Sequence, residues 1–317
     1  MARLVAYRDA LDSSEPDWCV RGVLEGLGLL WGEAGVGKSF VACSLAASVA
    51  TGRPWLGHRV REGAVVYVAG EGGAASVARR LDAAVLALRC CDPEDGPVPL
   101  WIVTPGVDMV AGPAELMAVL DGVRPGLIII DTLARCFGGD ENSSQDMSRF
   151  VRSLDLLRDL YACSVLVVHH ANKTDRSGAG KVRGSSVLYG AVDVSLQLVA
   201  EGRTGAKLVA DKLRDRDVTA PVAEFRFESV PLWGERDDLG DERTTRVVRP
   251  SETFETALVG VASVAMRGSV SYAGWRAACA PYPKEMFDRL VTAVLGDPET
   301  WGVHEHAPGA GVYGGRR

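Results

Sequence analysis

Three features are scarce in this sequence: an excess of positive charge, a long hydrophobic run and a pattern of paired cysteines. The formal net charge is −6, which argues against a protein that coats DNA through bulk positive charge but allows a local basic channel or one DNA-reading helix. No apolar run approaches the length that spans a bilayer, and residues 1–9 contain no signal-peptide core. We therefore expect a cytoplasmic protein without membrane contact.

The seven cysteines are odd in number and lack the paired C-x-x-C spacing of metal ligands. Most of them, such as Cys43 and Cys163, lie within apolar runs, so we expect reduced side chains in the core of a cytosolic protein. Cys90 and Cys91 form a vicinal pair, which is compatible with a redox role or with chance.

The pattern G-x-x-x-x-G-K-S is complete at residues 32–39. The apolar run 27–31 predicts a buried strand before it, and 40–47 predicts a helix after it, so that backbone N–H groups and the helix N-terminus would face phosphate oxygens. We expect Lys38 to reach the β- and γ-phosphates and Ser39 to hold Mg²⁺. The alternative is a glycine-rich turn without a ligand. The predicted site for ATP or GTP comprises Gly32, Glu33, Ala34, Gly35, Val36, Gly37, Lys38, Ser39 and Phe40.

Strand-like and helical segments alternate from about residue 27 to residue 200. Continuous apolar strands separated by helices, such as 64–69 and 127–130, indicate an α/β fold whose mostly parallel sheet is covered on both faces. Antiparallel strands that extend the sheet are predicted at 194–199, 207–213 and 222–227. We therefore expect an ATPase core at residues 1–230.

The remaining chain divides into two parts. Residues 231–251 are polar and dense in charge, which predicts a linker. Residues 252–317 predict a small α+β module with three helices and a hairpin, the pattern of a winged-helix domain that often reads DNA. The alternative is a helical packing module without a ligand.

Two carboxylates follow apolar strands of the predicted sheet. Asp131 ends the run 127–130, the Walker B arrangement that places an acid beside Mg²⁺. Glu71 follows a strand that ends at Ala69 and lies among glycines, where a carboxylate could orient and deprotonate an attacking water. A solvated loop glutamate is the alternative for Glu71.

Histidines and cations mark three further places. His169 and His170 end an apolar strand, where they could sense the γ-phosphate or, if a third ligand were present, bind a metal. Residues 173–186 are rich in glycine and positive charge, so they could line a DNA channel or send an arginine to a neighbouring subunit. Lys212 and Arg214 present two cations on one strand face, suited to stabilising a transferred phosphoryl group in trans. Solvated charges are the alternative for each.

Taken in order, these motifs resemble the RecA-like ATPase core, nearest to the RepA-type replicative helicases, AAA-type ATPases of phages and plasmids within the DnaB/RecA superfamily. The resemblance spans roughly residues 15 to 230. It rests on Trp18 with Gly26-Leu27, the P-loop, Thr51 to Gly57, Ala69-Gly70-Glu71, Asp131-Thr132, His169 to Lys173, Arg183 to Ser186 and Lys212-Leu213-Arg214.

The resemblance implies a role for each matched residue. Glu71 would be the catalytic carboxylate, Asp131 the acid on the Mg²⁺ side and His170 the γ-phosphate sensor. Arg183 would be an arginine finger, and Lys212 with Arg214 a second pair acting in trans. Arg80 falls where the family has an arginine that stacks on adenine. The cofactors implied are ATP and Mg²⁺.

The family assembles as rings, usually homohexamers, with ATP sites between subunits and single-stranded DNA in a central channel. We therefore expect a DNA-dependent ATPase of helicase type in phage, plasmid or mobile-element replication. The alternatives are a recombinase-like or regulatory ATPase switch, and a nucleotide-sensing DNA-binding regulator. The module at 252–317 departs from the minimal members of the family and would contact duplex DNA or a protein.

Overall fold

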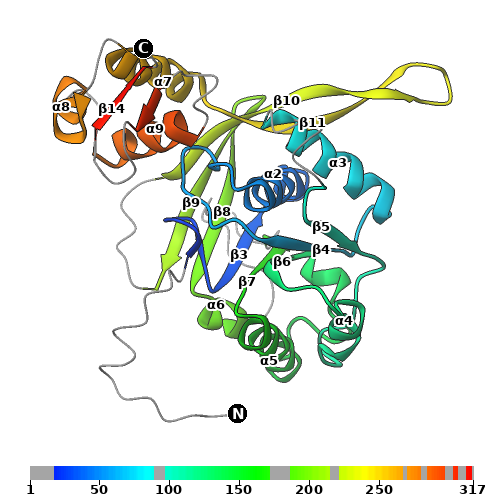
Figure 1. The fold of residues 1–317 in the computed structure, drawn as a ribbon. Coiled ribbons are helices and arrows are strands. Elements are labelled where there is room, and N and C mark those ends of the chain that lie inside the picture. The colour runs from blue at the N-terminus through cyan, green and yellow to red at the C-terminus, as the bar shows by residue number, and fades with distance from the viewer. Residues whose placement is uncertain are drawn as a thin grey trace, which may run out of the picture.

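The computed structural model describes residues 18–88, 97–171, 186–214, 221–266, 270–279, 284–296, 303–305 and 312–315. Within them, a nine-stranded mixed sheet carries helices on both faces and is followed by a smaller C-terminal module (Figure 1). The strand order is β11-β10-β9-β8-β3-β7-β6-β4-β5, and a separate antiparallel pair, β1 (Trp18–Val20) and β2 (Leu24–Glu25), precedes it. The predicted α/β fold class is confirmed.

Six neighbouring strands run parallel and form the centre of the sheet. They are β3 (Leu27–Gly32), β4 (Ala64–Ala69), β5 (Leu100–Val103), β6 (Pro125–Asp131), β7 (Ser164–His170) and β8 (Val194–Glu201). Alternate side chains of β6 enter opposite cores: Leu127 and Ile129 pack on one face, whereas Ile128 and Ile130 pack on the other. Because both faces are buried, these strands are continuous apolar runs, as the sequence predicts.

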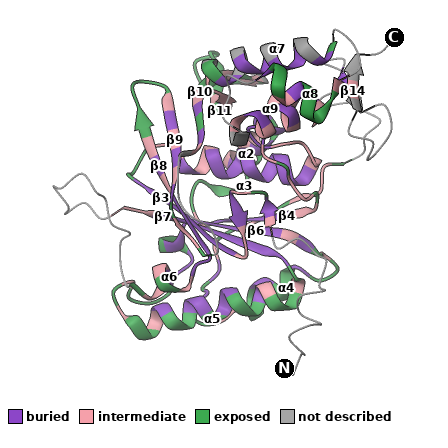
Figure 2. Ribbon diagram, turned by 90° about the vertical axis from the view of Figure 1, so that its left-hand side faces the viewer, coloured by how far each residue is buried: buried purple, intermediate pink, exposed green. Residues whose placement is uncertain are grey.

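The helices divide between the two faces of the sheet (Figure 2). On one face lie α2 (Lys38–Thr51) and α3 (Gly73–Ala87), and on the other lie α4 (Ala114–Val119), α5 (Ser144–Tyr161) and α6 (Ser186–Ala191). The Ser143 side chain caps α5 by accepting a hydrogen bond from the Asp146 amide. A short 3₁₀ turn, η1 (Leu133–Arg135), follows β6. The aliphatic side chains of β6 from Leu127 onward are thereby removed from water.

The sheet continues through three antiparallel strands, β9 (Gly205–Leu213), β10 (Pro221–Arg236) and β11 (Glu242–Pro250). The prediction of a linker at 231–251 is therefore wrong, because most of this segment is paired in a long hairpin that reaches past α3 (Figure 1). Its polar composition reflects an edge hairpin exposed to water, where charged side chains are common. The hairpin is also tied to α3, since Arg79 Nε lies 2.6 Å from Glu235 Oε2.

The C-terminal module has its own small core. Its elements are α7 (Glu252–Met266), β12 (Val270–Ser271), α8 (Tyr272–Ala278), α9 (Lys284–Gly296), β13 (Val303–Glu305) and β14 (Val312–Gly315). The strands form an antiparallel sheet in the order β12-β14-β13, and Trp275 is buried with its Nε1 donating to the Val261 carbonyl at 2.8 Å. Three helices and a hairpin are thus present where the sequence predicts them, and the winged-helix assignment remains a prediction.

The module is docked on the segment that follows α2. Arg289 Nη2 in α9 donates to the Leu56 carbonyl at 3.0 Å, and Arg53 Nη1 donates to the carbonyl of Gly296, the last residue of α9, at 2.9 Å. Gly57 has φ 81°, and a Cβ there would lie 2.7 Å from the Arg289 carbonyl. Trp55 anchors this segment to α2, because its buried Nε1 donates to Ser44 Oγ at 3.2 Å. Residues 53–57 therefore connect the P-loop helix to α9.

The described cysteines are buried and form no disulfide: Cys19, Cys43, Cys136, Cys163 and Cys279. Burial raises the pKa of the first four thiols to about 12. The prediction of reduced core cysteines is confirmed for these residues, whereas Cys90 and Cys91 lie outside the described part of the chain. No helix in the described ranges is both long and apolar enough to cross a membrane.

Candidate nucleotide site

The predicted P-loop joins β3 to α2 at the carboxyl edge of the parallel strands. Gly35 and Gly37 have φ of 79° and 105°, values that L side chains rarely adopt, so these two positions need glycine. A Cβ on Gly32 would lie 2.7 Å from the Leu198 carbonyl of β8, so the start of the loop also needs close backbone approach. The loop therefore presents backbone N–H groups at the N-terminus of α2, the arrangement that binds phosphate.

An aromatic wall stands beside the loop. The Phe227 ring, from β10, occupies the space that a Cβ on Gly37 would need, and it contacts the ring of Phe40 with centroids 6.2 Å apart. The Arg80 guanidinium lies over the other part of this cluster, 5.2 Å from the Phe40 ring centroid. Next to them is a cavity of about 660 Å³ between α2, α3 and the β10–β11 hairpin, lined in part by Phe40, Ser76 and Arg80. Arg80 and Phe40 are thus neighbours, as the predicted base site requires.

Lys38 is buried within the loop that it belongs to. Its Nζ donates to the carbonyls of Gly32 and Glu33 at 3.0 and 2.8 Å and lies 3.4 Å from His170 Nδ1. Burial lowers the pKa of Lys38, whereas the charges of Asp131 and Glu71 act in the opposite direction. The ammonium group therefore stands between the P-loop and both candidate carboxylates.

Asp131 lies beside the P-loop helix with one oxygen bonded and the other available. Its Oδ2 accepts a hydrogen bond from the Tyr67 hydroxyl at 2.5 Å, whereas its buried Oδ1 meets no hydrogen-bond donor among the described residues. Burial raises the pKa of this carboxyl, and the hydroxyls of Tyr67 and Ser39 lower it. An orphaned buried carboxylate oxygen near a serine hydroxyl fits Mg²⁺, which prefers oxygen ligands.

Glu71 lies at the same edge and is more exposed. Its Oε1 accepts a hydrogen bond from Thr132 Oγ1 at 3.2 Å and lies 3.7 Å from Arg135 Nε. The pairing of β4 with β6 places Ala69 opposite Asp131, so the residues that follow the two strands lie close together. About half of the Glu71 side chain is exposed, which leaves it access to water. This geometry suits a group that holds a water molecule.

His170 ends β7 opposite Gly32, the first residue of the P-loop. The amide of Ala171 donates to the Gly32 carbonyl at 2.9 Å, so the end of β7 is fixed against the loop. His169 points into the protein and is fully buried. In the described ranges no group of three His, Cys, Asp or Glu side chains could hold a metal, so the alternative of a metal site at this histidine pair gains no support there.

Lys212 and Arg214 lie at the opposite end of the sheet from the P-loop of their own chain. Gly28 pairs with Val194, and Val194 pairs with Leu213, so these cations stand near the start of β3, whereas the P-loop follows its end. At about 3.3 Å per residue, the two ends of β3 are roughly 16 Å apart. The structure therefore does not bring these two cations to the site of the same chain. Arg183 falls within 172–185, outside the described residues.

Sequence reasoning missed three contributors to this site: Tyr67, Phe227 and Thr132 with its bond to Glu71. Tyr67 carried a usable signal, because it is the one residue with a polar tip in the otherwise aliphatic strand at 64–69. Phe227 carried none, since its contact with Gly37 depends on where β10 joins the sheet. The predicted residues that the structure does bring together are Lys38, Ser39, Glu71, Asp131 and His170.

The sheet and this site define a P-loop ATPase with a RecA-like core. The family model described as "AAA domain" matches residues 4–176, more than half of the chain, and the chain belongs to this family.

Two solved structures with similar folds are the ATPase domain of a helicase and the RadB recombinase. The first has 14% sequence identity and a TM-score of 0.46, and the match covers 64% of this chain and 81% of that chain. The second has 20% identity and a TM-score of 0.48, with coverage of 64% and 87%.

Proposed function

We propose that this protein is an ATP-hydrolysing, DNA-dependent ring motor that resembles RepA-type hexameric helicases and acts on single-stranded DNA in phage, plasmid or mobile-element replication. The observation that carries the proposal is the separation of two half-sites. Lys38, Asp131 and Glu71 lie at one end of the sheet, and Lys212 with Arg214 lie at the other. Such a chain completes its sites when copies pack head to tail, and repeated head-to-tail contacts close into rings.

In the proposed reaction, a water molecule held by Glu71 attacks the γ-phosphate in line. Glu71 accepts the proton of that water, and Lys38 stabilises the charge on the β- and γ-phosphates. Ser39 and Asp131 would hold Mg²⁺, which supplies further neutralisation of phosphate charge when bound. His170, 3.4 Å from Lys38 Nζ, is placed to sense whether the γ-phosphate is present.

The base of the nucleotide is assigned to the cavity beside Phe40 and Arg80. A guanidinium stacked near an aromatic ring offers a flat face on which adenine can lie. The cavity of about 660 Å³ has room for a nucleoside. The P-loop residues 32–39 would hold the phosphates from the adjoining side.

The remaining charge stabilisation is assigned to a neighbouring copy. Lys212 and Arg214 would act in trans on the transferred phosphoryl group, and Arg183 is kept as the candidate arginine finger from the family resemblance. Arg183→Ala should lower turnover, and Lys38→Ala subunits, which still supply Arg183, should restore part of it in mixed assemblies. Mixed assemblies without recovery would contradict a trans role for Arg183.

The first experiment is ATP hydrolysis by the purified chain with and without single-stranded DNA, with Glu71→Gln as the blank. A motor whose sites are completed on the strand should be stimulated by DNA and should translocate only while it hydrolyses ATP. Turnover that is the same with and without DNA would overturn the motor proposal.

A regulatory or recombinase-like switch is the second candidate, and the docked C-terminal module favours it. α9 is bonded to the segment that follows the P-loop helix, so nucleotide state and module position have a direct connection. This candidate predicts that ATP changes assembly state or duplex binding by the full chain without translocation. Sequence-specific duplex binding that depends on nucleotide, together with no strand movement, would select it over the motor.

A further inference from the structure

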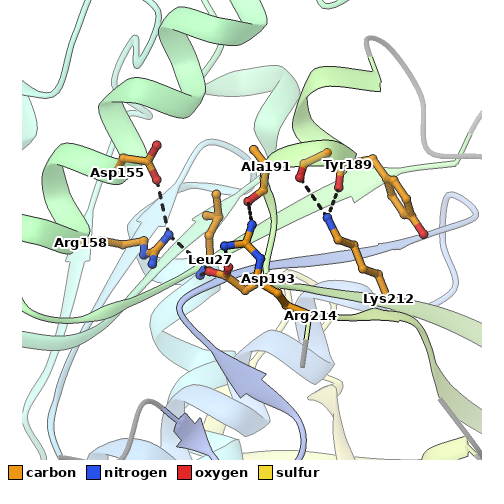
Figure 3. A network of polar contacts seen from close by, with 9 residues as sticks. Leu27, Asp155, Arg158, Tyr189, Ala191, Asp193, Lys212 and Arg214 are labelled. Atoms are coloured by element: carbon orange, nitrogen blue, oxygen red, sulfur yellow. Dashed lines mark hydrogen bonds and ion pairs between the residues drawn. The ribbon is translucent and has the colours of Figure 1, made fainter. Parts of the chain in front are cut away.

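A second polar centre lies at the amino end of the parallel strands, away from the P-loop. It is built around Asp193, which stands between α6 and β8 with only 10% of its side chain exposed (Figure 3). Side chains from α5 and β9 and the first amide of β3 converge on it. A carboxylate buried to this degree is stable only when it is paired and hydrogen-bonded.

Both oxygens of Asp193 are used. Oδ1 lies 2.7 Å from Arg214 Nη1, and Oδ2 accepts the Leu27 amide hydrogen at 2.8 Å. Arg158 Nη1 lies 3.3 Å from Oδ2. Gly26, with φ 54°, makes this possible, because a Cβ at that position would overlap Oδ2. The glycine before β3 is therefore explained by the approach of this carboxylate.

The cations beside Asp193 are also bonded to the end of α6. Lys212 Nζ donates to the carbonyls of Tyr189 and Gly190 at 2.8 and 3.0 Å, and Arg214 Nη2 donates to the Ala191 carbonyl at 3.3 Å. Carbonyls in the last turn of a helix carry partial negative charge that the helix itself does not satisfy, so cations suit them. Although it is held on two sides, the Arg214 side chain is 53% exposed. The guanidinium is thus fixed in direction while it still faces solvent.

We propose that Asp193 is a positioning residue that holds Arg214, and with it the Lys212–Arg214 pair, in the place from which the pair reaches the nucleotide of a neighbouring copy. This inference rests on the proposed trans role of these cations. A cation that is already oriented costs little reorganisation when charge develops on the phosphoryl group, and small misplacements of such groups lower rates strongly.

The same carboxylate connects two sites along one strand. Through the Leu27 amide, Asp193 bonds the first residue of β3, and the last residue of β3, Gly32, opens the P-loop. The cations that serve the neighbour's site and the loop that holds the chain's own nucleotide are therefore fixed to the two ends of one buried strand. A shift of β3 on nucleotide binding is passed to Arg214 without an intervening loop.

The test compares Asp193→Asn with Arg158→Gln. Asparagine keeps the volume and an acceptor for the Leu27 amide but removes the charge that pairs with Arg214. We expect kcat for ATP to fall on the order of 10²-fold with KM for ATP nearly unchanged. Arg158→Gln removes another ion pair of Asp193 and leaves Arg214 bonded, so it should lower the unfolding temperature while kcat stays the same.

Mixed assemblies separate a trans effect from damage to β3. Lys38→Ala subunits cannot use their own P-loop but carry an intact Asp193 and Arg214, so mixing them with Asp193→Asn subunits should restore turnover at the sites of the latter. In an Arg214→Ala background, Asp193→Asn should cause no further loss. Absence of recovery on mixing, or an equal loss in the Arg214→Ala background, would overturn the positioning role.

Arg214→Ala alone distinguishes the failure of this inference from that of the trans proposal. If Arg214→Ala leaves kcat unchanged, the trans role itself fails; if it lowers kcat whereas folded Asp193→Asn does not, only the positioning role fails. Should Asp193→Asn not fold, Arg214→Lys replaces it, because one ammonium group cannot reproduce the two directed bonds to Asp193 and Ala191. Unchanged kcat in Arg214→Lys would show that charge without position suffices and would overturn the inference.

Discussion

The Tyr67 hydroxyl, in β4, donates to Asp131 Oδ2, at the end of β6, across 2.5 Å. Both groups are buried, and the bond directs the second carboxylate oxygen, Oδ1, toward a position without a protein donor in the described part of the chain. Hydrogen bonds to a metal-binding carboxylate orient it and tune its affinity. Tyr67 therefore belongs to the candidate Mg²⁺ site although it would not touch the ion.

Replacing Tyr67 with phenylalanine should shift the Mg²⁺ dependence of turnover to higher pH. The hydroxyl lowers the pKa of Asp131 against the effect of burial, so its removal raises that pKa. Mg²⁺ competes with the proton for the carboxylate, and at a fixed neutral pH the variant should need on the order of 10-fold more Mg²⁺. ATP turnover measured over a grid of pH and Mg²⁺ concentration checks this. A Mg²⁺ requirement identical to that of the wild type at every pH would contradict the assignment.

Lys38→Ala should abolish turnover, with a loss of at least about 10²-fold. Lys38 is the buried cation of the loop, held by the Gly32 and Glu33 carbonyls, and alanine leaves the phosphates without it. Phosphate release and fluorescent-nucleotide binding provide the measurement. Lys207→Ala is the matched control, since Lys207 is a partly exposed lysine of β9 paired with Glu201. Full activity in Lys38→Ala would remove the P-loop assignment.

Glu71→Gln should retain ATP binding and lose hydrolysis by roughly 10²- to 10⁴-fold. Glutamine keeps the hydrogen bond with Thr132 but cannot accept the proton of the attacking water. Single-turnover hydrolysis and a separate binding titration distinguish the two steps. The control is Glu115→Gln, an exposed acid in the first turn of α4. Unchanged single-turnover rates would move the base to another residue.

Gly37→Ala and Gly35→Ala separate two reasons for glycine in the loop. Both positions have positive φ, but only a Cβ on Gly37 would overlap Phe227, whereas a Cβ on Gly35 would meet open space. Nucleotide affinity should fall in both variants and more in Gly37→Ala. Adding Phe227→Ala should recover part of the loss in Gly37→Ala and none in Gly35→Ala. Equal responses of the two variants to Phe227→Ala would show that the ring does not shape the loop.

Much of the nucleotide site could be predicted from the sequence because its residues follow apolar strands. The segments 64–69 and 100–103 form strands with the predicted limits, since continuous aliphatic runs bounded by polar residues have one natural place in a buried parallel sheet. Asp131 and His170 end such strands, and parallel strands deliver their carboxyl ends to one edge. Local pattern and three-dimensional position therefore agree there.

The rest depended on strand order, which local patterns do not determine. The β10–β11 hairpin has a polar sequence because it lies at the edge of the sheet, so polarity alone gave the wrong prediction of a linker. Asp193 and Arg214 are likewise ordinary charges in the sequence, and only the pairing of β3 with β8 and of β8 with β9 places them together. Tyr67 and Asp131, 64 positions apart, meet for the same reason.

The docking of α9 links two binding events. To offer α9 to duplex DNA, the chain would have to give up the bonds from Arg289 to Leu56 and from Arg53 to Gly296. Trp55 holds that same segment on the helix that begins at Lys38. A ligand that draws α9 away must therefore alter affinity for nucleotide, and nucleotide must alter affinity for that ligand by the same factor. The sign of this shared factor would show whether the module restrains the ATPase or assists it.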